Sequence, residues 1–198
     1  MLKRTLDILC SLLGLCLLSP LFIIVAILVG FTSKGGVFFV QKRVGLNNHD
    51  FDLLKFRTMF VESEKNGLLT IGGKDPRITS IGYFIRKYKI DELPQLVNVL
   101  FGTMSLVGPR PEVRKYVDKY TDEQKEVLLV QPGITDYASL EYFSENELLA
   151  KSSDPEKTYL TEIMPAKLEL NKKYIVEAGL VTDLKIIFRT IKRIFVSG

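Results

Sequence analysis

Residues 8–31 read "ILCSLLGLCLLSPLFIIVAILVGF", and no charged residue interrupts them. A helix rises about 1.5 Å per residue, so this stretch is long enough to cross the hydrocarbon core of a bilayer, which is about 30 Å thick. A cleavable signal peptide has a shorter apolar region and a small-residue cleavage site, and this stretch shows no such site. We therefore expect the segment to stay in the chain as a membrane helix.

Ser19 and Pro20 interrupt the middle of this helix. Proline lacks the backbone donor and clashes with the preceding turn, which kinks a helix, and a serine hydroxyl can satisfy the freed carbonyl. Basic residues lie on both sides of the segment: Lys3, Arg4, Lys34, Lys42 and Arg43. The positive-inside rule then gives no preferred orientation. A re-entrant helix that bends at Ser19-Pro20 and returns to the same face satisfies both flanks, and a kinked helix that spans the membrane is the alternative.

The C-terminal stretch, residues 180–198, has the pattern of a basic amphipathic helix. Apolar residues recur at helical spacing and basic residues fill much of the rest: Leu184, Ile187, Ile191, Ile194 and Phe195, with Lys185, Arg189, Lys192 and Arg193. Such a helix can lie in the interface of an anionic leaflet, or it can pack on the domain with its charged face in solvent. A chain that is already tethered at its N-terminus favours the membrane.

The part that follows the apolar segment is long enough for one domain with its own core. We expect residues 1–33 to form the re-entrant membrane helix and residues 34–198 to form a compact cytoplasmic domain. Sequence patterns predict these elements: strands at 37–45 and 51–59, a loop at 66–79, helices at 80–88 and 94–102, helices opened by capping boxes at 121–124 and 144–147, and a helix from 154 that Pro165 interrupts. The predicted fold class is α-rich α+β, with short strands and interfacial amphipathic helices.

Composition excludes several kinds of site. The two cysteines, Cys10 and Cys16, lie in the apolar segment, too close on one helix for a disulfide framework. His49 is the one histidine, which leaves too few ligands for a Cys/His zinc site, and a Ser–His–Asp triad would depend on it alone. A metal would therefore be a hard cation on carboxylates, which points to Mg²⁺. The net charge of +4 is modest and no reading helix or aromatic platform is present, which argues against nucleic acid.

The stretch "KIDELPQLVNVL", residues 89–100, places Asp91 and Glu92 directly before a helix that Pro94 opens. A helix start stabilises anions, so capping alone could account for the two acids. Arginines, whose forked geometry matches phosphate oxygens, lie in nearby turn-rich segments: Arg57, Arg77, Arg86 and Arg110. A carboxylate pair among arginines also fits a site for Mg²⁺ and phosphate. The glycine-rich stretch 67–75 is not a P-loop, because the required Lys-Ser/Thr is absent.

Several motifs occur in order along the chain: "KRTLDI" (3–8), "LLSP" (17–20), "FFVQKRVG" (38–45), "KFRTM" (55–59), "DPRIT..G..IRK" (75–87), "DELPQLVNVLFGTMSLVGPRPE" (91–112) and "QPGIT" (131–135). In this combination the chain resembles the bacterial sugar transferase family, the monotopic polyprenyl-phosphate phosphoglycosyl transferases. The similarity covers most of the chain, and the signature at 91–112 is highly specific. At 198 residues the chain resembles the minimal catalytic form of the family.

The resemblance implies an enzyme that moves a phosphosugar from a UDP-sugar to polyprenyl phosphate, usually undecaprenyl phosphate, and releases UMP. It implies Asp91 as the nucleophile of a covalent intermediate, Glu92 as its partner, and Mg²⁺ at Asp91 as the cofactor. The expected phosphate- and nucleotide-binding residues are Lys55, Arg57, Arg86 and Arg110. The implied location is the cytoplasmic face of the bacterial inner membrane, at the first membrane step of glycan assembly, with Ser19-Pro20 as the break of the re-entrant helix. A homodimer is compatible with this reading.

One segment departs from the family pattern. After "PGIT" many relatives continue with "GLAQVNGR", whereas this chain reads "DYASLEYFSENE" at 136–147. We expect residues 136–150 to lie near the nucleotide or the sugar of the donor, and the departure leaves the sugar unidentified. Two other readings stay open, a membrane-bound Mg²⁺-dependent phosphohydrolase and a non-catalytic interfacial scaffold. Dependence of UMP release on polyprenyl phosphate tests the first, and the effect of Asp91→Asn tests the second.

Overall fold

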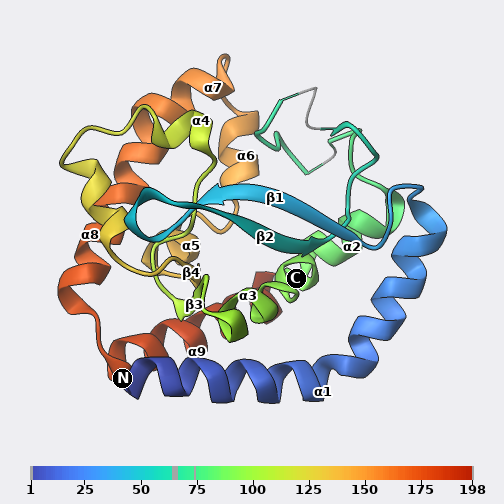
Figure 1. Ribbon diagram of the computed structural model, residues 1–198. Coiled ribbons are helices and arrows are strands. Elements are labelled where there is room, and N and C mark those ends of the chain that lie inside the picture. The colour runs from blue at the N-terminus through green and yellow to red at the C-terminus, as the bar shows by residue number, and fades with distance from the viewer. Residues whose placement is uncertain (1, 64–66, 74, 198) are drawn as a thin grey trace.

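The computed structural model describes residues 2–63, 67–73 and 75–197. It is a helix-rich α+β fold in which a long bent helix, α1 (Leu2–Thr32), runs along the outside of the remaining elements (Figure 1). These follow in the order β1 (Phe38–Val44), η1 (Leu46–Asn48), β2 (Asp50–Phe56), α2 (Ser80–Lys87), η3 (Ile90–Glu92), α3 (Gln95–Phe101), β3 (Ser105–Val107), α4 (Arg114–Val117), η4 (Gln124–Leu129), β4 (Gly133–Thr135), α5 (Tyr137–Glu141), α6 (Glu145–Ala150), α7 (Pro155–Thr158), η5 (Tyr159–Ile163), α8 (Met164–Glu177) and α9 (Leu180–Ser197).

The predicted hairpin is confirmed. Strands β1 and β2 pair antiparallel, with Phe38 opposite Phe56, and the turn between them holds Asn47 and Asn48 at positive φ, which asparagine tolerates. The second strand ends at Phe56, earlier than predicted. Beyond it the chain turns toward the start of α2, where Gly82 lets the helix approach closely, since an added Cβ would lie 2.2 Å from a backbone oxygen.

The two helices on either side of the acidic pair are also confirmed. Thr79 caps α2 by accepting a hydrogen bond from the amide of Gly82 (3.1 Å). Pro94 directly precedes α3, and Gly102 ends it with φ of 86°, a conformation that favours glycine. The predicted loop at 66–79 falls between the hairpin and α2, although its residues 66 and 74 lie outside the described residues.

A parallel pair, β3 with β4, was not predicted, because we assigned 103–112 to turns. Each strand has three residues, too few for an alternating pattern to show. The two segments approach each other closely at Gly133 of β4 and at Gly108, which directly follows β3. A Cβ added to Gly133 would lie 2.1 Å from the amide nitrogen of Gly108, so this contact requires glycine. This contact brings the segment after β3, which carries Arg110, alongside the segment after β4.

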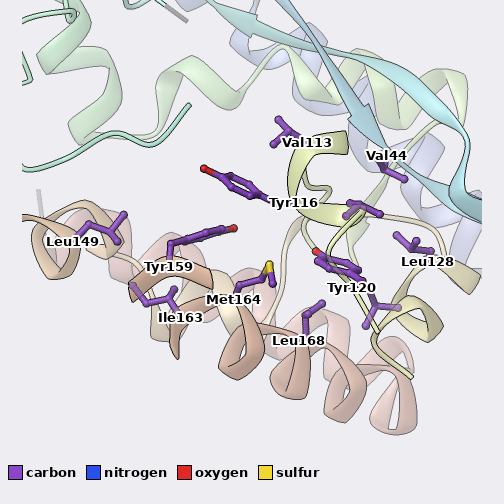
Figure 2. Packing of buried hydrophobic residues seen from close by; sticks show 12 residues of the cluster. Val44, Val113, Tyr116, Tyr120, Leu128, Leu149, Tyr159, Ile163, Met164 and Leu168 are labelled. Atoms are coloured by element: carbon purple, nitrogen blue, oxygen red, sulfur yellow. The ribbon is translucent and has the colours of Figure 1, made fainter. Parts of the chain in front are cut away.

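The capping and helix predictions for the C-terminal half are partly right. Thr121 and Gln124 form the reciprocal capping box, which opens the 3-10 helix η4. Ser144 precedes α6 but makes no side-chain capping bond, because its backbone (φ −107°, ψ 40°) is not in the extended conformation that a capping residue usually adopts. Pro165 causes no break, since it lies in the first turn of α8 directly after the π-helical turn η5. These elements and β1 enclose the largest apolar cluster, in which Tyr116, Tyr159 and Leu168 are buried (Figure 2).

The break in α1 has the predicted chemistry. Pro20 cannot donate to the carbonyl of Cys16, and the hydroxyl of Ser19 donates to that same oxygen at 2.8 Å. Figure 1 shows α1 changing direction along its length, so that it forms two arms. This proline therefore bends the helix without leaving that carbonyl unpaired.

Both arms of α1 contact the same body of the protein. In the first arm, Arg4 donates to the carbonyls of Val99 and Leu100 at the end of α3, and Asp7 accepts from the hydroxyl of Ser105 (2.9 Å). In the second arm, Val25 and Val29 are buried against Phe56 and Ile85. Lys3 and Arg4, which we predicted only as flanking charges, thus anchor the helix: Lys3 forms an ion pair with Asp183 of α9.

Two helices present large apolar side chains to the outside. In the part of the chain that the structure describes, α1 is the one helix long and apolar enough to cross a membrane. Exposed apolar residues of α1 include Leu9, Leu13, Leu17, Ile23, Ile24, Ile27 and Phe31. Those of α9 are Val181, Leu184, Phe188, Ile191, Phe195 and Val196. The apolar stripe of the C-terminal helix is therefore exposed, while the buried Asp183 and Ile186 hold the helix to the domain.

Candidate active site

Asp91 and Glu92 lie in the turn that joins α2 to α3. Lys89 opens the turn with φ of 55°, and one 3-10 turn carries the chain into the proline and α3. The amides of Glu92 and Leu93 are already bonded within this turn. Within the described part of the chain neither carboxylate accepts a hydrogen bond from a helix amide, so capping does not account for the pair.

Glu92 is held by two cations. Both terminal nitrogens of Arg110 donate to its two oxygens, and the ammonium of Lys55 lies 3.6 Å from Oε1. Burial raises the pKa of Glu92, but the charges of Arg110, Lys55 and Lys89 outweigh burial and hold that pKa well below its usual range. Glu92 is therefore ionised and fixed in place.

Asp91 is in a different state. It is 6% exposed, and its Oδ1 has no hydrogen-bond partner among the described residues. Burial raises the pKa of Asp91 and the charge of Glu92 raises it further, while Lys55, Arg86 and Lys89 oppose the rise. A buried carboxylate oxygen without a partner is costly, so this atom is available to a cation or to a reacting group. The two adjacent acids thus have separate environments, one fixed and one free.

Three of the four predicted phosphate-binding side chains come together at this turn. Arg110 and Lys55 contact Glu92 directly. The guanidinium of Arg86 donates to the hydroxyls of Thr70 (2.9 Å) and Thr58 (3.4 Å), and its charge acts on Asp91. The site therefore concentrates positive charge around one free carboxylate, as binding of a diphosphate requires.

The other two arginines face other partners. Arg57 donates to the carbonyls of Gly36 and Phe38 and lies over the ring of Phe39, so its contacts order the connection from α1 to β1. Arg77 forms a bidentate pair with Asp75 and donates to loop carbonyls, so it orders the loop before α2. Of the arginines that we expected to converge, Arg86 and Arg110 have charges that are among the largest charge effects on the acidic pair.

Comparison with known proteins gives the family. The profile described as "Bacterial sugar transferase" matches residues 1–197. The chain belongs to the bacterial sugar transferase family.

Relatives within this family carry names that describe undecaprenyl-phosphate chemistry. The UDP-N-acetylgalactosamine-undecaprenyl-phosphate N-acetylgalactosaminephosphotransferase of Aeromonas hydrophila is 39% identical over 97% of this chain and 43% of its own length. The UDP-glucose:undecaprenyl-phosphate glucose-1-phosphate transferase of Escherichia coli K12 is 35% identical over 100% of this chain and 41% of its own length. This chain thus spans less than half the length of these two relatives. The exopolysaccharide production protein ExoY of Rhizobium meliloti is 32% identical, with 100% and 87% covered.

Asp91 is the residue at this turn that could hold one Mg²⁺ ion. No group of three or more acidic, histidine or cysteine side chains gathers as a metal site in the described ranges. Mg²⁺ needs no such cage, because it is commonly bound through one or two carboxylates, phosphate oxygens of the substrate and water. Asp91, with its unpartnered Oδ1, meets that requirement, whereas Glu92 is already occupied by Arg110.

Sequence reasoning missed several side chains at the site of this family member. Gln95, one turn after Asp91, is 1% exposed, and its amide nitrogen has no partner among the residues described. Asp136 accepts from the amide of Arg110 (3.2 Å), which places the first residue of the divergent segment beside the arginine that holds Glu92. From that segment, Phe143 approaches Lys89. Two signals in the sequence indicated these residues: the adjacency of Gln95 and Lys89 to the acids, and the expectation that residues 136–150 lie near the donor. The individual contacts depend on tertiary structure.

Proposed function

We propose that this protein transfers a phosphosugar from a UDP-sugar to polyprenyl phosphate, with undecaprenyl phosphate as the acceptor, on the cytoplasmic face of the bacterial inner membrane. The observation that carries the proposal is the pair of unlike acids: Asp91 is buried and free at Oδ1, and Glu92 beside it is fixed by Arg110 and Lys55. Relatives named for transfer of sugar phosphates to undecaprenyl phosphate support the same chemistry.

The proposed reaction has two displacements at phosphorus. A carboxylate oxygen of Asp91 attacks the β-phosphorus of the UDP-sugar, the bond from that phosphorus to the bridging oxygen breaks, and UMP leaves with the bond's electron pair. The phosphosugar is then an acyl phosphate on Asp91. An oxygen of the lipid phosphate attacks the same phosphorus, the bond to Asp91 breaks, and the product is a polyprenyl-diphosphate sugar. A nucleophilic carboxylate divides one difficult transfer into two easier ones.

The surrounding residues would support both steps. An ionised aspartate can attack without a general base, and the usual pKa of an aspartate lies well below neutral pH. Lys55, Arg86 and Arg110 supply positive charge to the phosphate oxygens, and burial of Asp91 removes competing water. Mg²⁺ bound at Asp91 would further neutralise the diphosphate.

The proposed membrane arrangement is monotopic. Both arms of α1 contact the same domain, through Arg4 and Asp7 on one side of the break and Val25 and Val29 on the other. The exposed apolar residues of α1 and α9 would then face lipid while the charged site faces the cytoplasm. This arrangement puts the site at the level of the headgroups, where a lipid phosphate is found.

Cysteine labelling tests the topology. Cys10 and Cys16 are replaced by serine, and Leu2→Cys or Lys34→Cys introduces one exposed thiol at either end of α1. With a membrane-impermeant maleimide we expect both thiols to react in inverted vesicles and neither in intact spheroplasts, because a re-entrant helix leaves both ends on one side. Labelling of the two positions from opposite sides would show a spanning helix.

The transfer assay tests the function itself. The full chain in lipid nanodiscs is given UDP-glucose, UDP-galactose and their N-acetylated forms, with and without undecaprenyl phosphate. We expect at most one UMP per protein without the lipid and continued turnover with it, for at least one of the sugars. Continued release of UMP without the lipid would indicate a phosphohydrolase, and no release under any condition would favour a scaffold.

The pH dependence of turnover should follow the charge of Lys55. Burial lowers the pKa of Lys55 to about 8, although Glu92 opposes the shift. The ammonium therefore loses its charge above pH 8, and we expect turnover to fall there. In Lys55→Arg the fall in turnover should move up by about one pH unit or more, since guanidinium stays charged.

The stability of the protein should change in the opposite sense over the same pH range. The unfolded lysine titrates near 10.4, so from about pH 8 to 10.4 the unfolded chain binds more protons than the folded chain. The contribution of Lys55 to the free energy of unfolding therefore rises over this range.

The control for the pH profile is Lys42→Arg, at an exposed lysine on β1 that pairs with Asp52. This variant should leave the alkaline limb in place. If Lys55→Arg also leaves the limb unmoved, the limb belongs to another group and Lys55 has no charged role in transfer.

A further inference from the structure

Phe143 carries two cations on its ring. The ammonium of Lys89 lies 5.1 Å from the ring centre, and the guanidinium carbon of Arg193 lies 5.7 Å from it. Phe143 belongs to the connection between α5 and α6, inside the segment that departs from the family pattern. Cation–π contacts of this kind hold a long charged side chain in place without neutralising it.

Within the described residues neither cation forms an ion pair with an acid, although the charge of Lys89 acts on Asp91 and Glu92 at longer range. In the residues that the structure describes, no ion pair within 4.0 Å involves Lys89 or Arg193, although fourteen ion pairs occur elsewhere in those residues. Two like charges on one neutral ring repel each other. An anion that contacts both would remove this repulsion.

Lys89 connects this pair to the reacting carboxylate. It stands two residues before Asp91, and its charge acts on both acids. Its backbone has φ of 55°, a left-handed conformation that costs a lysine free energy and that glycine adopts easily. Such a conformation indicates that the surrounding turn fixes where this side chain begins.

Arg193 connects the pair to the membrane-facing side. It lies on α9, and the exposed apolar stripe of that helix includes Phe188, Ile191 and Phe195. Figure 1 shows the C-terminal end of α9 close to the turn between α2 and α3, in agreement with the contacts on Phe143. The two cations therefore lead from the helix that would contact lipid to the turn that holds Asp91.

We propose that Lys89 and Arg193, positioned by Phe143, form a phosphate subsite for the membrane-borne acceptor, a lipid phosphate monoester. This inference rests on the proposed function. The cations on Glu92 and near Asp91, namely Lys55, Arg86 and Arg110, are left for the diphosphate of the soluble donor. A second pair of cations would receive the lipid phosphate from the membrane side, on a path that passes Arg193 before Lys89.

The test separates the two substrates by direct binding. The full chain is placed in phosphatidylcholine nanodiscs, and dissociation constants are measured for undecaprenyl phosphate, undecaprenol, inorganic phosphate and UMP. We expect Lys89→Gly and Arg193→Gln each to weaken binding of undecaprenyl phosphate by about tenfold or more, the usual loss for a charged hydrogen bond, and to change UMP binding by less than about twofold. Undecaprenol and inorganic phosphate should bind weakly to every form, because the subsite needs the phosphate on a lipid.

Stability and neighbouring variants distinguish binding from a structural role. Lys89→Gly should unfold at the same or a higher temperature, because glycine relieves the positive φ. Phe143→Leu should weaken binding of undecaprenyl phosphate several-fold. Phe143→Tyr should leave this binding unchanged, because tyrosine retains the cation–π contact. Lys87→Ala, which removes an exposed charge of α2, is the matched control and should bind normally.

Three results would overturn the subsite: equal losses for UMP and the lipid in Lys89→Gly, unchanged lipid affinity in both cation variants, or equally tight binding of inorganic phosphate. Failure of the proposed function looks different. In that case the wild-type chain binds undecaprenyl phosphate with the expected dependence on Lys89 but releases no UMP, and the subsite stands without the transfer.

Discussion

Asp91→Asn is expected to lower the rate of the proposed phosphosugar transfer by at least about 10³-fold, because loss of the proposed nucleophile would remove the whole covalent route. The amide has nearly the same shape as the carboxylate, so the turn between α2 and α3 should persist. Burial raises the pKa of Asp91, which means that the fold disfavours its charge. Removing that charge should leave the unfolding temperature unchanged or higher.

Intact-mass spectrometry checks the same variant at the level of the intermediate. Incubated with the preferred UDP-sugar and without acceptor, the wild-type protein should gain the mass of one phosphosugar, and Asp91→Asn should gain none. Asp52→Asn, at a half-exposed acid of β2 that pairs with Lys42, is the matched control and should gain the mass normally. Normal product formation by Asp91→Asn would remove Asp91 from the mechanism.

Arg110→Leu is expected to lower both stability and activity. It leaves Glu92, whose side chain is 12% exposed, with Lys55 at 3.6 Å as its remaining contact cation. Breaking a buried pair by removing one partner costs about 3 kcal/mol. Arg110 holds the pKa of Glu92 down, so that pair stabilises the fold above the unfolded pKa of about 4.3 and is lost as pH falls through the lower folded value. The variant should therefore lose most stability near neutral pH and little in acid.

A double-mutant cycle measures this pair. Denaturant unfolding of Arg110→Leu, Glu92→Gln and the double variant should show that the double variant recovers much of the stability, because no buried charge is left alone. It should not recover transfer activity, since the cation for the donor phosphates is gone. Additive losses of stability would mean that the two side chains do not interact in solution.

Local patterns in the sequence predicted the elements that depend on local chemistry. The apolar run with Ser19-Pro20 gave the bent α1, the alternating segments gave the hairpin, and Pro94 with Gly102 bounded α3. The pair β3–β4 could not be predicted, because three-residue strands carry no period and their contact depends on two glycines that meet only in the folded chain. Ser144 shows the limit of capping patterns, since it precedes α6 but does not adopt the extended backbone of a capping residue.

The residues of the candidate site also divide into those that the sequence predicted and those that depend on the folded chain. Motif order placed Lys55, Arg86 and Arg110 with the acidic pair, and the structure gathers them there. Arg57 lies in a matching motif but binds carbonyls next to its own strand, which the sequence could not reveal. Lys89 and Phe143 are separated by more than fifty residues, so their contact emerges only from the way α5, α6 and α9 pack.

The contact of Arg4 with α3 also links the position of α1 to the position of the acidic pair. Arg4 of α1 donates to carbonyls near the end of α3, and α3 begins three residues after Glu92, so one short helix connects α1 with the acidic turn. In the proposed membrane arrangement, a bilayer that is too thin or too thick for α1 would tilt α1 and, through α3, shift the carboxylates of Asp91 and Glu92. Transfer is therefore expected to depend on the acyl-chain length of the host membrane even when the acceptor lipid is unchanged.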